Sequence, residues 1–144
     1  DGARGAHLSL DELMQWHYEP PYDFYDIAAD PFEDESKVHV VRGDDGRAEA
    51  FWYFDRPDDG VVEIGIGLRP DLIGRGLGER YLQPELDYAR ERWQPRVFRL
   101  YVASWNARAI RLYERVGFRE VGERHVRTFE GFGEHEFLRM ERPA

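Results

Sequence analysis

The segment from Val61 to Gly78, VVEIGIGLRPDLIGRGLG, joins a strand pattern to a glycine-rich turn. In its first half, aliphatic residues alternate with smaller or polar ones, as is typical of a β-strand: Val62, Ile64, Ile66 and Leu68. Pro70 has no N–H group to donate to a sheet, so the strand is predicted to end by Arg69. Three alternating glycines then lead into a helical pattern: Gly74, Gly76 and Gly78.

A strand, a glycine-rich turn and a helix in this order can present free backbone N–H groups to an anion. The positive end of the helix dipole favours the same ligand. The G-x-G-x-G spacing is neither the dinucleotide-binding G-x-G-x-x-G nor the Gly-Lys-Ser/Thr of a P-loop. An ordinary tight connection between a strand and a helix has the same residues, so the turn alone leaves both interpretations open.

Composition narrows the class of protein. The 144 residues fit one domain, 1–144, and 42% hydrophobic with 15% aromatic residues predict a folded core despite 34% charged residues. The net charge of −9 argues against a nucleic-acid partner, because phosphate binding requires a basic surface. An acidic surface suits a cationic ligand, although it also serves solubility.

Three features that the sequence lacks limit the possible sites and the location of the protein: cysteine, a long apolar run and a signal-peptide pattern. Cysteine is absent, which excludes disulfides, thiolate metal sites and a cysteine nucleophile, and no metal site is expected. No apolar run approaches the roughly 20 residues of a transmembrane helix, and no signal-peptide pattern is visible. We therefore expect a cytoplasmic protein with no membrane partner, either a monomer or a homodimer. The abrupt start leaves open that upstream residues have been removed.

The first third of the chain is predicted to be partly helical. A weak edge strand covers residues 3–8, and Ser9 with Glu12 forms a capping box for a helix that begins at Leu10. Residues 18–36 then form an acidic, aromatic connection. A meander of three strands follows, over residues 37–42, 48–54 and 61–68, with turns at 43–46 and 56–60.

The remaining chain alternates between helical and strand patterns. A helical face extends from Leu77 through Trp93 with Pro84 inside it, where a bend is expected. A strand over residues 96–103 is followed by a helix over 106–116, which Gly117 ends as the C′ residue. Two alternating strands, 118–127 and 134–140, close the chain.

Two segments of the sequence resemble motifs of the GNAT superfamily of N-acetyltransferases. Leu68 to Gly78 looks like its acetyl-CoA loop, and Asn106 to Phe118, NARAIRLYERVGF, resembles its N-x-x-A-x-x-L-Y-x-x-x-G-F signature. The two lie one helix and one strand apart, in the order of the family. In the loop motif Q/R-x-x-G-x-G/A the first position here is Ile73. Because most contacts of that loop come from backbone N–H groups, phosphate binding is expected to survive.

The resemblance implies an α/β (α+β) fold with a mixed, mostly antiparallel sheet of six to seven strands. Helices would flank both faces, and the central strands, 61–68 and 96–103, would splay apart. Residues 37–140 would then form the acetyl-CoA-binding core. Residues 9–36 would lie on the acceptor side of the site, with a first strand that is truncated or weak.

The resemblance also implies acetyl-CoA (CoA) as the cosubstrate. The glycine loop would hold the pyrophosphate, and the pantetheine arm would pair with strand main chain like an added strand. The implied residues are Ile66, Gly67, Leu68, Ile73, Gly74, Arg75, Gly76, Leu77, Gly78 and Asn106. Arg75 is equally expected as a solvated arginine, and Asn106 also fits the N-cap of its helix.

The catalytic groups are less determined. By resemblance Tyr113 is the general acid for the departing thiolate, and its alternative is core packing beside neighbouring apolar residues. Glu63 is the nearest base candidate, but strict alternation places it on the opposite face from Val62, where an ungapped alignment puts the base. A β-bulge would restore the register. Tyr101 occupies a position where some relatives carry Glu, and His125 or the acidic connection are further candidates.

The acceptor is expected on the acidic connection, where aromatic rings and carboxylates together suit a cationic amine: Tyr18, Glu19, Tyr22, Asp23, Tyr25 and Asp26. A solvated acidic loop explains these residues equally well. The sequence therefore predicts an N-acetyltransferase that transfers acetyl directly to a primary amine of a small molecule or a peptide or protein N-terminus. The alternatives are a transferase for a longer acyl-CoA and a non-catalytic acyl-CoA-binding or sensory module.

Overall fold

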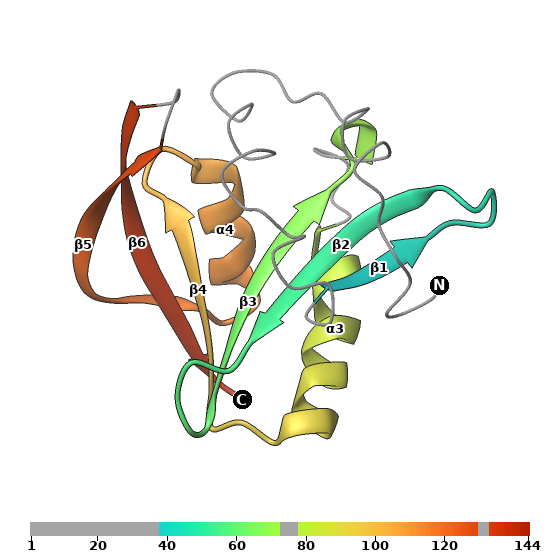
Figure 1. Ribbon diagram of the computed structural model, residues 1–144, viewed down its shortest axis with the longest axis horizontal. Coiled ribbons are helices and arrows are strands. Elements are labelled where there is room, and N and C mark those ends of the chain that lie inside the picture. The colour runs from blue at the N-terminus through green and yellow to red at the C-terminus, as the bar shows by residue number, and fades with distance from the viewer. Residues whose placement is uncertain (1–37, 73–77, 130–132) are drawn as a thin grey trace.

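The computed structural model describes residues 38–72, 78–129 and 133–144 (Figure 1). These residues form six strands, two α-helices and one short 3-10 helix. In chain order the elements are β1 (Val38–Arg42), β2 (Ala48–Asp55), β3 (Val61–Leu68), η3 (Pro70–Leu72), α3 (Gly78–Trp93), β4 (Val97–Ala103), α4 (Ala107–Arg115), β5 (Arg119–Phe129) and β6 (Gly133–Pro143).

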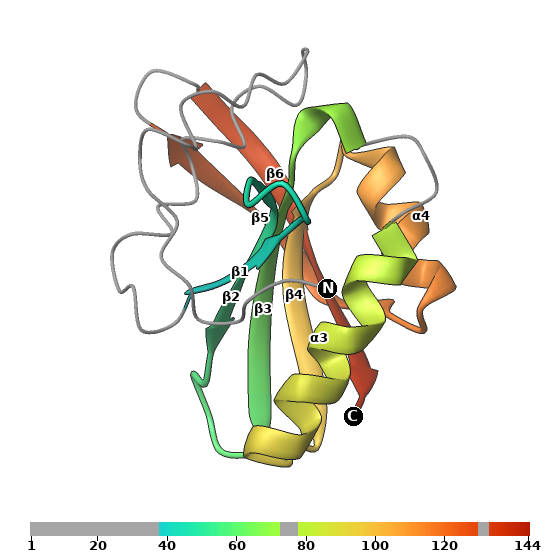
Figure 2. The same cartoon turned by 90° about the vertical axis from the view of Figure 1, so that its right-hand side faces the viewer.

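All six strands belong to one mixed sheet with the order β1-β2-β3-β4-β6-β5. Only β3 and β4 pair in parallel, and every other neighbouring pair is antiparallel. Both α3 and α4 lie on one face of this sheet, which we call the helical face (Figure 2). The predicted mixed, mostly antiparallel sheet is confirmed. The helices expected within residues 9–36, and the weak strand before them, lie outside the described residues.

The meander from β1 to β3 follows the sequence prediction closely. Gly46 and Gly60 have positive φ angles of 80° and 74°, and they stand in the two turns that join the three strands. β3 ends at Leu68, one residue before the predicted limit at Arg69, since Pro70 opens the 3-10 helix η3. Local alternation and turn residues were sufficient here because each connection is short.

The main core fills the space between the helical face and the two helices. Alternate strand residues point into it, and Trp52, Phe98 and Phe118 are fully buried there. α3 contributes Leu82, Leu86 and Ala89 to the same core. Pro84 lies on the exposed side of α3, so the helix continues past it to Trp93. The described strands thus share one sheet and one main core.

The C-terminal hairpin is longer than predicted. β5 extends to Phe129, and β6 extends from Gly133 to Pro143, three residues beyond the predicted end at Met140. Glu141 and Arg142 break the polar–apolar alternation of the sequence, but β6 lies between β4 and β5 and is paired with β4 as far as Pro143. Pairing with two neighbours, which the local pattern does not encode, therefore lengthens the strand.

Candidate active site

The central strands β3 and β4 pair only at their beginnings. Their register joins Val61 to Val97, Val62 to Phe98 and Glu63 to Arg99, and the structure gives no further pair between them. β3 nevertheless remains paired with β2 as far as Leu68, and β4 with β6 as far as Ala103. The two strands consequently diverge toward their carboxyl ends (Figure 1), and the splay that the family resemblance implied is present.

In β3, the main-chain N–H and C=O groups of every second residue point toward the open side of this splay. At one end, the Gly60 carbonyl accepts hydrogen bonds from Arg96 and Val97 beside β4, at N···O distances of 2.7 and 3.1 Å. At the other end, the Arg69 N–H points the opposite way and donates to Glu49 O at 2.8 Å. Because successive residues of a strand face opposite edges, even-numbered residues such as Ile66 and Leu68 face the open edge.

The residues that follow β3 hold the chain in place where it enters the glycine loop. Arg69 forms a two-pronged ion pair with Asp71, with Nε–Oδ1 and Nη2–Oδ2 distances of 2.6 and 3.1 Å. Its Nη1 also donates to Ala48 O at 3.2 Å. The hydrogen bonds that Arg69 donates to Asp71 raise the pKa of its guanidinium, which stays charged at any working pH. Arg69 therefore anchors the β3 end to β2.

Gly78 is the one glycine of the loop motif within the described residues. It begins α3 directly against α4, where an added Cβ would lie 2.6 Å from Leu112 Cδ2. Only glycine permits this close approach of the two helices without displacing Leu112. The other predicted loop residues lie outside the described part of the chain, so their contacts with a phosphate stay predictions: Ile73, Gly74, Arg75, Gly76 and Leu77.

Asn106 is the N-cap of α4, as its sequence context predicted. Its side-chain Oδ1 accepts a hydrogen bond from the Ala109 N–H at 3.2 Å, and the residue is 6% exposed. At the other end Gly117 has a φ of 99° and ends the helix in the expected left-handed conformation. The capping hydrogen bond does not show whether Asn106 also contacts the cosubstrate, so that contact stays a prediction.

Tyr113 lies in the main core, where it is 4% exposed. Its ring meets Phe118 edge-on, with the ring centroids 6.0 Å apart. The predicted core packing of Tyr113 is therefore confirmed. Its role as a general acid stays a prediction, because a packed ring can still donate a proton from its hydroxyl group. Tyr113 projects from α4 on the helical face, so an acid at this position would approach the splay from the side of the two helices.

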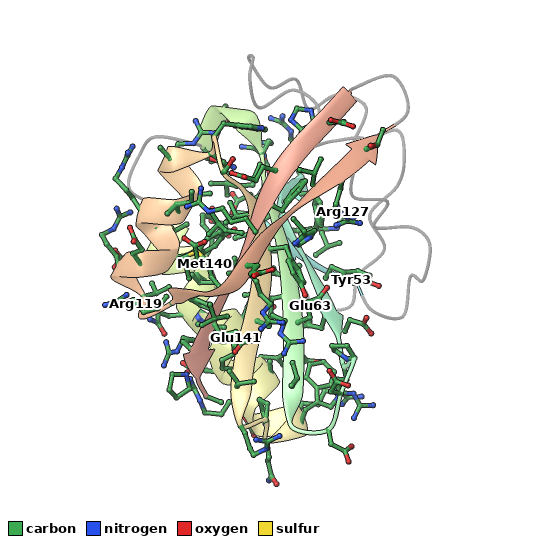
Figure 3. All side chains as sticks on the ribbon, turned by 90° about the vertical axis from the view of Figure 1, so that its left-hand side faces the viewer. Tyr53, Glu63, Arg119, Arg127, Met140 and Glu141 are labelled. Carbon is green, nitrogen blue, oxygen red and sulfur yellow. The ribbon has the colours of Figure 1, made fainter. Side chains whose placement is uncertain are left out.

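Glu63 lies on the opposite face from the helices. The β2–β3 register is regular from Ala50–Leu68 to Asp55–Glu63, so β3 has no bulge that would move Glu63 to the face of Val62. Val62 itself is 1% exposed and belongs to the main core. Glu63 is also the last β3 residue paired with β4, which places it beside the point where the splay opens (Figure 3).

A charged cluster surrounds this closed end of the splay. Arg99, which is paired with Glu63 across the strands, donates from Nε to Glu141 Oε2 at 2.7 Å, and both side chains are mostly buried. Burial alone lowers the pKa of Arg99, but the hydrogen bond and charge of Glu141 outweigh it, so the pKa is raised. Arg139 Nε approaches the same Glu141 oxygen at 3.6 Å.

The open end of the splay carries an aromatic cluster that the sequence did not reveal. Tyr101 on β4 meets the exposed His125 on β5 edge-on at 5.4 Å, and His125 stacks on Phe137 of β6 at 6.2 Å. The Arg127 guanidinium lies 5.6 Å from the Phe137 ring. Register explains the meeting, since His125 pairs with Phe137, and Phe137 with Ala103 beside Tyr101.

His125 was a base candidate from the sequence, and Tyr101 was noted as standing where some relatives carry Glu. Their contact depends on the insertion of β6 between β4 and β5. The local sequence gave one hint of this cluster. Alternation along β4, β5 and β6 places every second residue of each strand on the face opposite the helices. The predicted acceptor residues lie outside the described chain: Tyr18, Glu19, Tyr22, Asp23, Tyr25 and Asp26.

Two searches of the described residues bear on other classes of site. No group of three or more His, Asp or Glu side chains in ranges 38–72, 78–129 and 133–144 is arranged to hold a metal ion. Within the same ranges, no helix combines the length and apolar character needed to span a bilayer.

Comparison with known proteins agrees with this geometry. Residues 6–118 match the family model described as Acetyltransferase (GNAT) family. The chain belongs to the GNAT acetyltransferase family. The splayed β3 and β4 and the N-capped α4 are the elements on which its candidate site is built.

Mycothiol acetyltransferases are among the curated relatives. That of Clavibacter sepedonicus is 35% identical over 99 residues, covering 68% of this chain and 32% of that protein. That of Beutenbergia cavernae is 41% identical over 90 residues, covering 61% of this chain and 30% of that protein. The chain thus spans about a third of the length of these relatives.

Solved structures show the same fold. A spermidine N-acetyltransferase chimera from Vibrio cholerae and hSSAT superposes with a TM-score of 0.71, covering 96% of this chain and 93% of that chain at 20% identity. The ribosomal-protein-alanine N-acetyltransferase from Escherichia coli has a TM-score of 0.62 and 26% identity over 74% of this chain and 67% of that chain.

Proposed function

We propose that this GNAT protein is an acetyl-CoA-dependent N-acetyltransferase that acylates a primary amine directly. The observation that carries the proposal is the open edge of β3, where pairing with β4 stops after Glu63. Free main-chain groups at a strand edge accept an extended amide-containing chain as if it were another strand. The pantetheine arm of coenzyme A has this chemistry.

The described residues fit such a cosubstrate. Ile66 directs its main-chain groups to the open edge, and Gly67 follows it in the same strand. The glycine loop precedes the N-terminus of α3, which favours a pyrophosphate through the helix dipole and free N–H groups. When bound, acetyl-CoA supplies the activated acyl group, and the chain's own residues orient it and move protons.

The proton balance of the transfer requires one base and one acid. The protonated amine must lose one proton to the base before its nitrogen attacks the thioester carbon. After the N–C bond has formed, the nitrogen loses a second proton as the C–S bond breaks, and this proton replaces the one that the acid gives to the departing sulfur. Tyr113 is proposed to donate a proton to the departing sulfur from the helical face. Glu63, on the opposite face beside the start of the splay, is proposed to take the amine's proton.

The acceptor is proposed to be a cationic or extended amine, held on the face opposite the helices. The relatives named for mycothiol and spermidine acetylation support a small molecule, and a ribosomal-protein relative supports a peptide N-terminus. Within the described chain, Tyr101 and His125 offer aromatic faces to such an amine beside the open end of the splay. The acidic residues of the connection, Glu19, Asp23 and Asp26, would add charge pairing.

The test is release of coenzyme A thiol from acetyl-CoA in the presence of a panel of amines, with wild-type protein and Tyr113→Phe. If the hydroxyl is the acid, turnover falls by about 100-fold or more while coenzyme affinity changes little. The matched control is Tyr88→Phe, which removes a hydroxyl from α3 where the ring packs near Phe54 and Trp93.

Two outcomes would contradict the proposal in different ways. A Tyr113→Phe protein as fast as wild type would restrict Tyr113 to packing and remove it from the mechanism. Retained coenzyme without thiol release for any amine would show a binding module and no transferase.

A further inference from the structure

Arg139 lies in the middle of β6, on the face of the sheet opposite the helices. Leu138 and Met140 on either side of it belong to the main core, so the Arg139 side chain projects from the other face. Across the strands it is paired with Tyr101 of β4 and with Val121 of β5. The charged cluster lies one row toward the closed end of the splay, and the aromatic cluster begins at Tyr101. Arg139 therefore stands at the boundary between the two clusters that border the candidate site.

The charge of Arg139 is only weakly compensated within the described chain. Its Nε lies 3.6 Å from Glu141 Oε2, which is beyond the usual length of an N–H···O hydrogen bond, and the same oxygen already accepts from Arg99 Nε at 2.7 Å. Among the described residues, this buried Nε has no hydrogen-bond partner. Arg99, by contrast, also has Asp58 Oδ2 3.8 Å from its Nη1. Two guanidinium groups thus share one carboxylate, and Arg139 keeps most of its charge for a ligand.

An irregularity in β5 lies directly beside this guanidinium group. The register of β5 with β6 shifts between Val121 and His125, which marks a β-bulge. Gly122, within the bulge, has a φ of 70°, and a Cβ added there would lie 3.4 Å from Arg139 Nη2. Bulges are over-represented beside active sites, where they redirect side chains. The Arg139 side chain is 36% exposed, so a ligand in solvent can reach it.

The position of Arg139 sets how far an anion bound to it would lie from the reacting amine. The amine must reach the thioester at the splay between β3 and β4, where Glu63 is the proposed base. Arg139 stands one strand beyond β4, and neighbouring strands are about 4.8 Å apart. From this spacing, the anion would lie on the order of 5–10 Å from the amine nitrogen. An extended chain spans about 3.3–3.6 Å per residue, so an ω-amino acid or a dipeptide covers this distance.

We propose that Arg139 binds a carboxylate at the far end of the acceptor, so that this protein selects amines that also carry an anionic group. The inference rests on the proposed function and names a narrower class within it, because the acceptor is still a primary amine acylated at the splay. A guanidinium group matches the two oxygens of a carboxylate with parallel N–H donors. Tyr101 lies on the strand between the splay and Arg139, where the chain that joins amine and carboxylate would pack on its ring. A polyamine would instead place a second positive charge against Arg139, which is unfavourable.

The experiment measures thiol release with two pairs of acceptors that differ only at the far end: γ-aminobutyrate against 4-aminobutanamide, and glycylglycine against glycylglycinamide. In wild-type protein, kcat/KM should be about tenfold higher for each acid than for its amide, mainly through a lower KM, the scale of one charge-assisted contact. Arg139→Gln should raise the KM of the acids until the two ratios approach one. The kcat, the kinetics of the amides and the KM of acetyl-CoA should change little. Arg139→Lys keeps the charge without the planar fork, so it should retain part of the preference.

The ratio of acid to amide is taken within each variant, so a lower fraction of folded enzyme cancels. The matched control is Arg47→Gln, which removes the same charge from an exposed arginine in the turn between β1 and β2 and should keep the full preference. In the wild type, the preference should shrink as salt rises, because screening acts on exposed charges.

The outcomes separate this inference from the proposed function. Equal use of acid and amide by the wild type, or turnover of other amines only, would overturn the inference and leave the proposed function intact. A preference that survives Arg139→Gln, or that is lost in Arg127→Gln instead, would overturn it as well, by placing the carboxylate elsewhere. If the wild type releases thiol with no amine of a broad panel, the proposed function itself fails and this inference fails with it.

Discussion

Gly67 on β3 is expected to be intolerant of even one methyl group. It pairs with Phe51 of β2, whose ring lies over it on the face opposite the helices. A Cβ built on Gly67 would lie 2.5 Å from Phe51 Cζ, whereas carbon atoms in contact prefer about 3.5–4.0 Å. The ring would have to move by about 1 Å or more, and Phe51 is 8% exposed with little room to do so.

Gly65 provides a matched control on the same strand and the same face. A Cβ there would lie 3.6 Å from Tyr53 Cβ, an ordinary contact. Neither Gly65 nor Gly67 is among the glycines with a positive φ angle, so alanine fits the backbone at both. Replacing glycine by alanine restricts the unfolded chain at both sites alike, which by itself stabilises the folded state by about 0.4–1 kcal/mol.

The difference between the two variants isolates the contact with Phe51. Overpacking in a filled site costs about 1–3 kcal/mol, so Gly67→Ala should lower the free energy of unfolding while Gly65→Ala leaves it unchanged or slightly raised. For a chain of this length, each 1 kcal/mol corresponds to about 2–5 °C in Tm. Urea denaturation followed by fluorescence and thermal unfolding would both report it.

A double-mutant cycle tests the cause. Phe51→Leu shortens the side chain, so it should make Gly67→Ala less harmful, with a coupling of about 0.5 kcal/mol or more. The same change should leave the effect of Gly65→Ala unaltered. Equal stability of Gly67→Ala and Gly65→Ala, or strict additivity with Phe51→Leu, would refute the steric argument.

Two further stability predictions follow from single contacts. Asn106→Ala removes the acceptor for the Ala109 N–H and should lower the free energy of unfolding by about 1 kcal/mol, whereas Asn106→Asp should retain most of it; urea titration showing no loss for the alanine variant would contradict the cap. Glu141→Gln leaves the mostly buried Arg99 with a neutral partner and should destabilise by about 1–3 kcal/mol in the same assay, more than Glu134→Gln on the exposed end of β6. Equal losses in those two variants would mean that the Arg99–Glu141 pair is of no importance to the fold.

Local signals in the sequence predicted the elements of the fold well. The alternation in β3, the proline after it, the asparagine cap of α4 and the glycine that ends α4 each act within a few residues, so each was visible without the structure. Strand limits differed by more than one residue only in the C-terminal hairpin, where pairing with β4 extends β6 to Pro143. Charged residues in that extension hid its strand character.

In the candidate site, too, some features were predictable from the sequence and others only from the structure. The glycine loop and the α4 signature were recognisable as motifs, and strict alternation correctly placed Glu63 on the face opposite Val62. The sequence could not show that Glu63 lies where the splay opens, because that depends on how far β3 and β4 remain paired. Nor could it bring His125 against Tyr101, since these residues meet only through the position of β6.

The sequence by itself determined the strand and helix periods, the caps, the glycine-rich turn and the membership of the family, because these depend on neighbours along the chain. Tertiary structure alone decided the order of the strands, the point where β3 and β4 separate, and the placement of Arg139 between Tyr101 and Val121. Those features join residues of different elements, and only packing of the sheet and the helices fixes which of them meet.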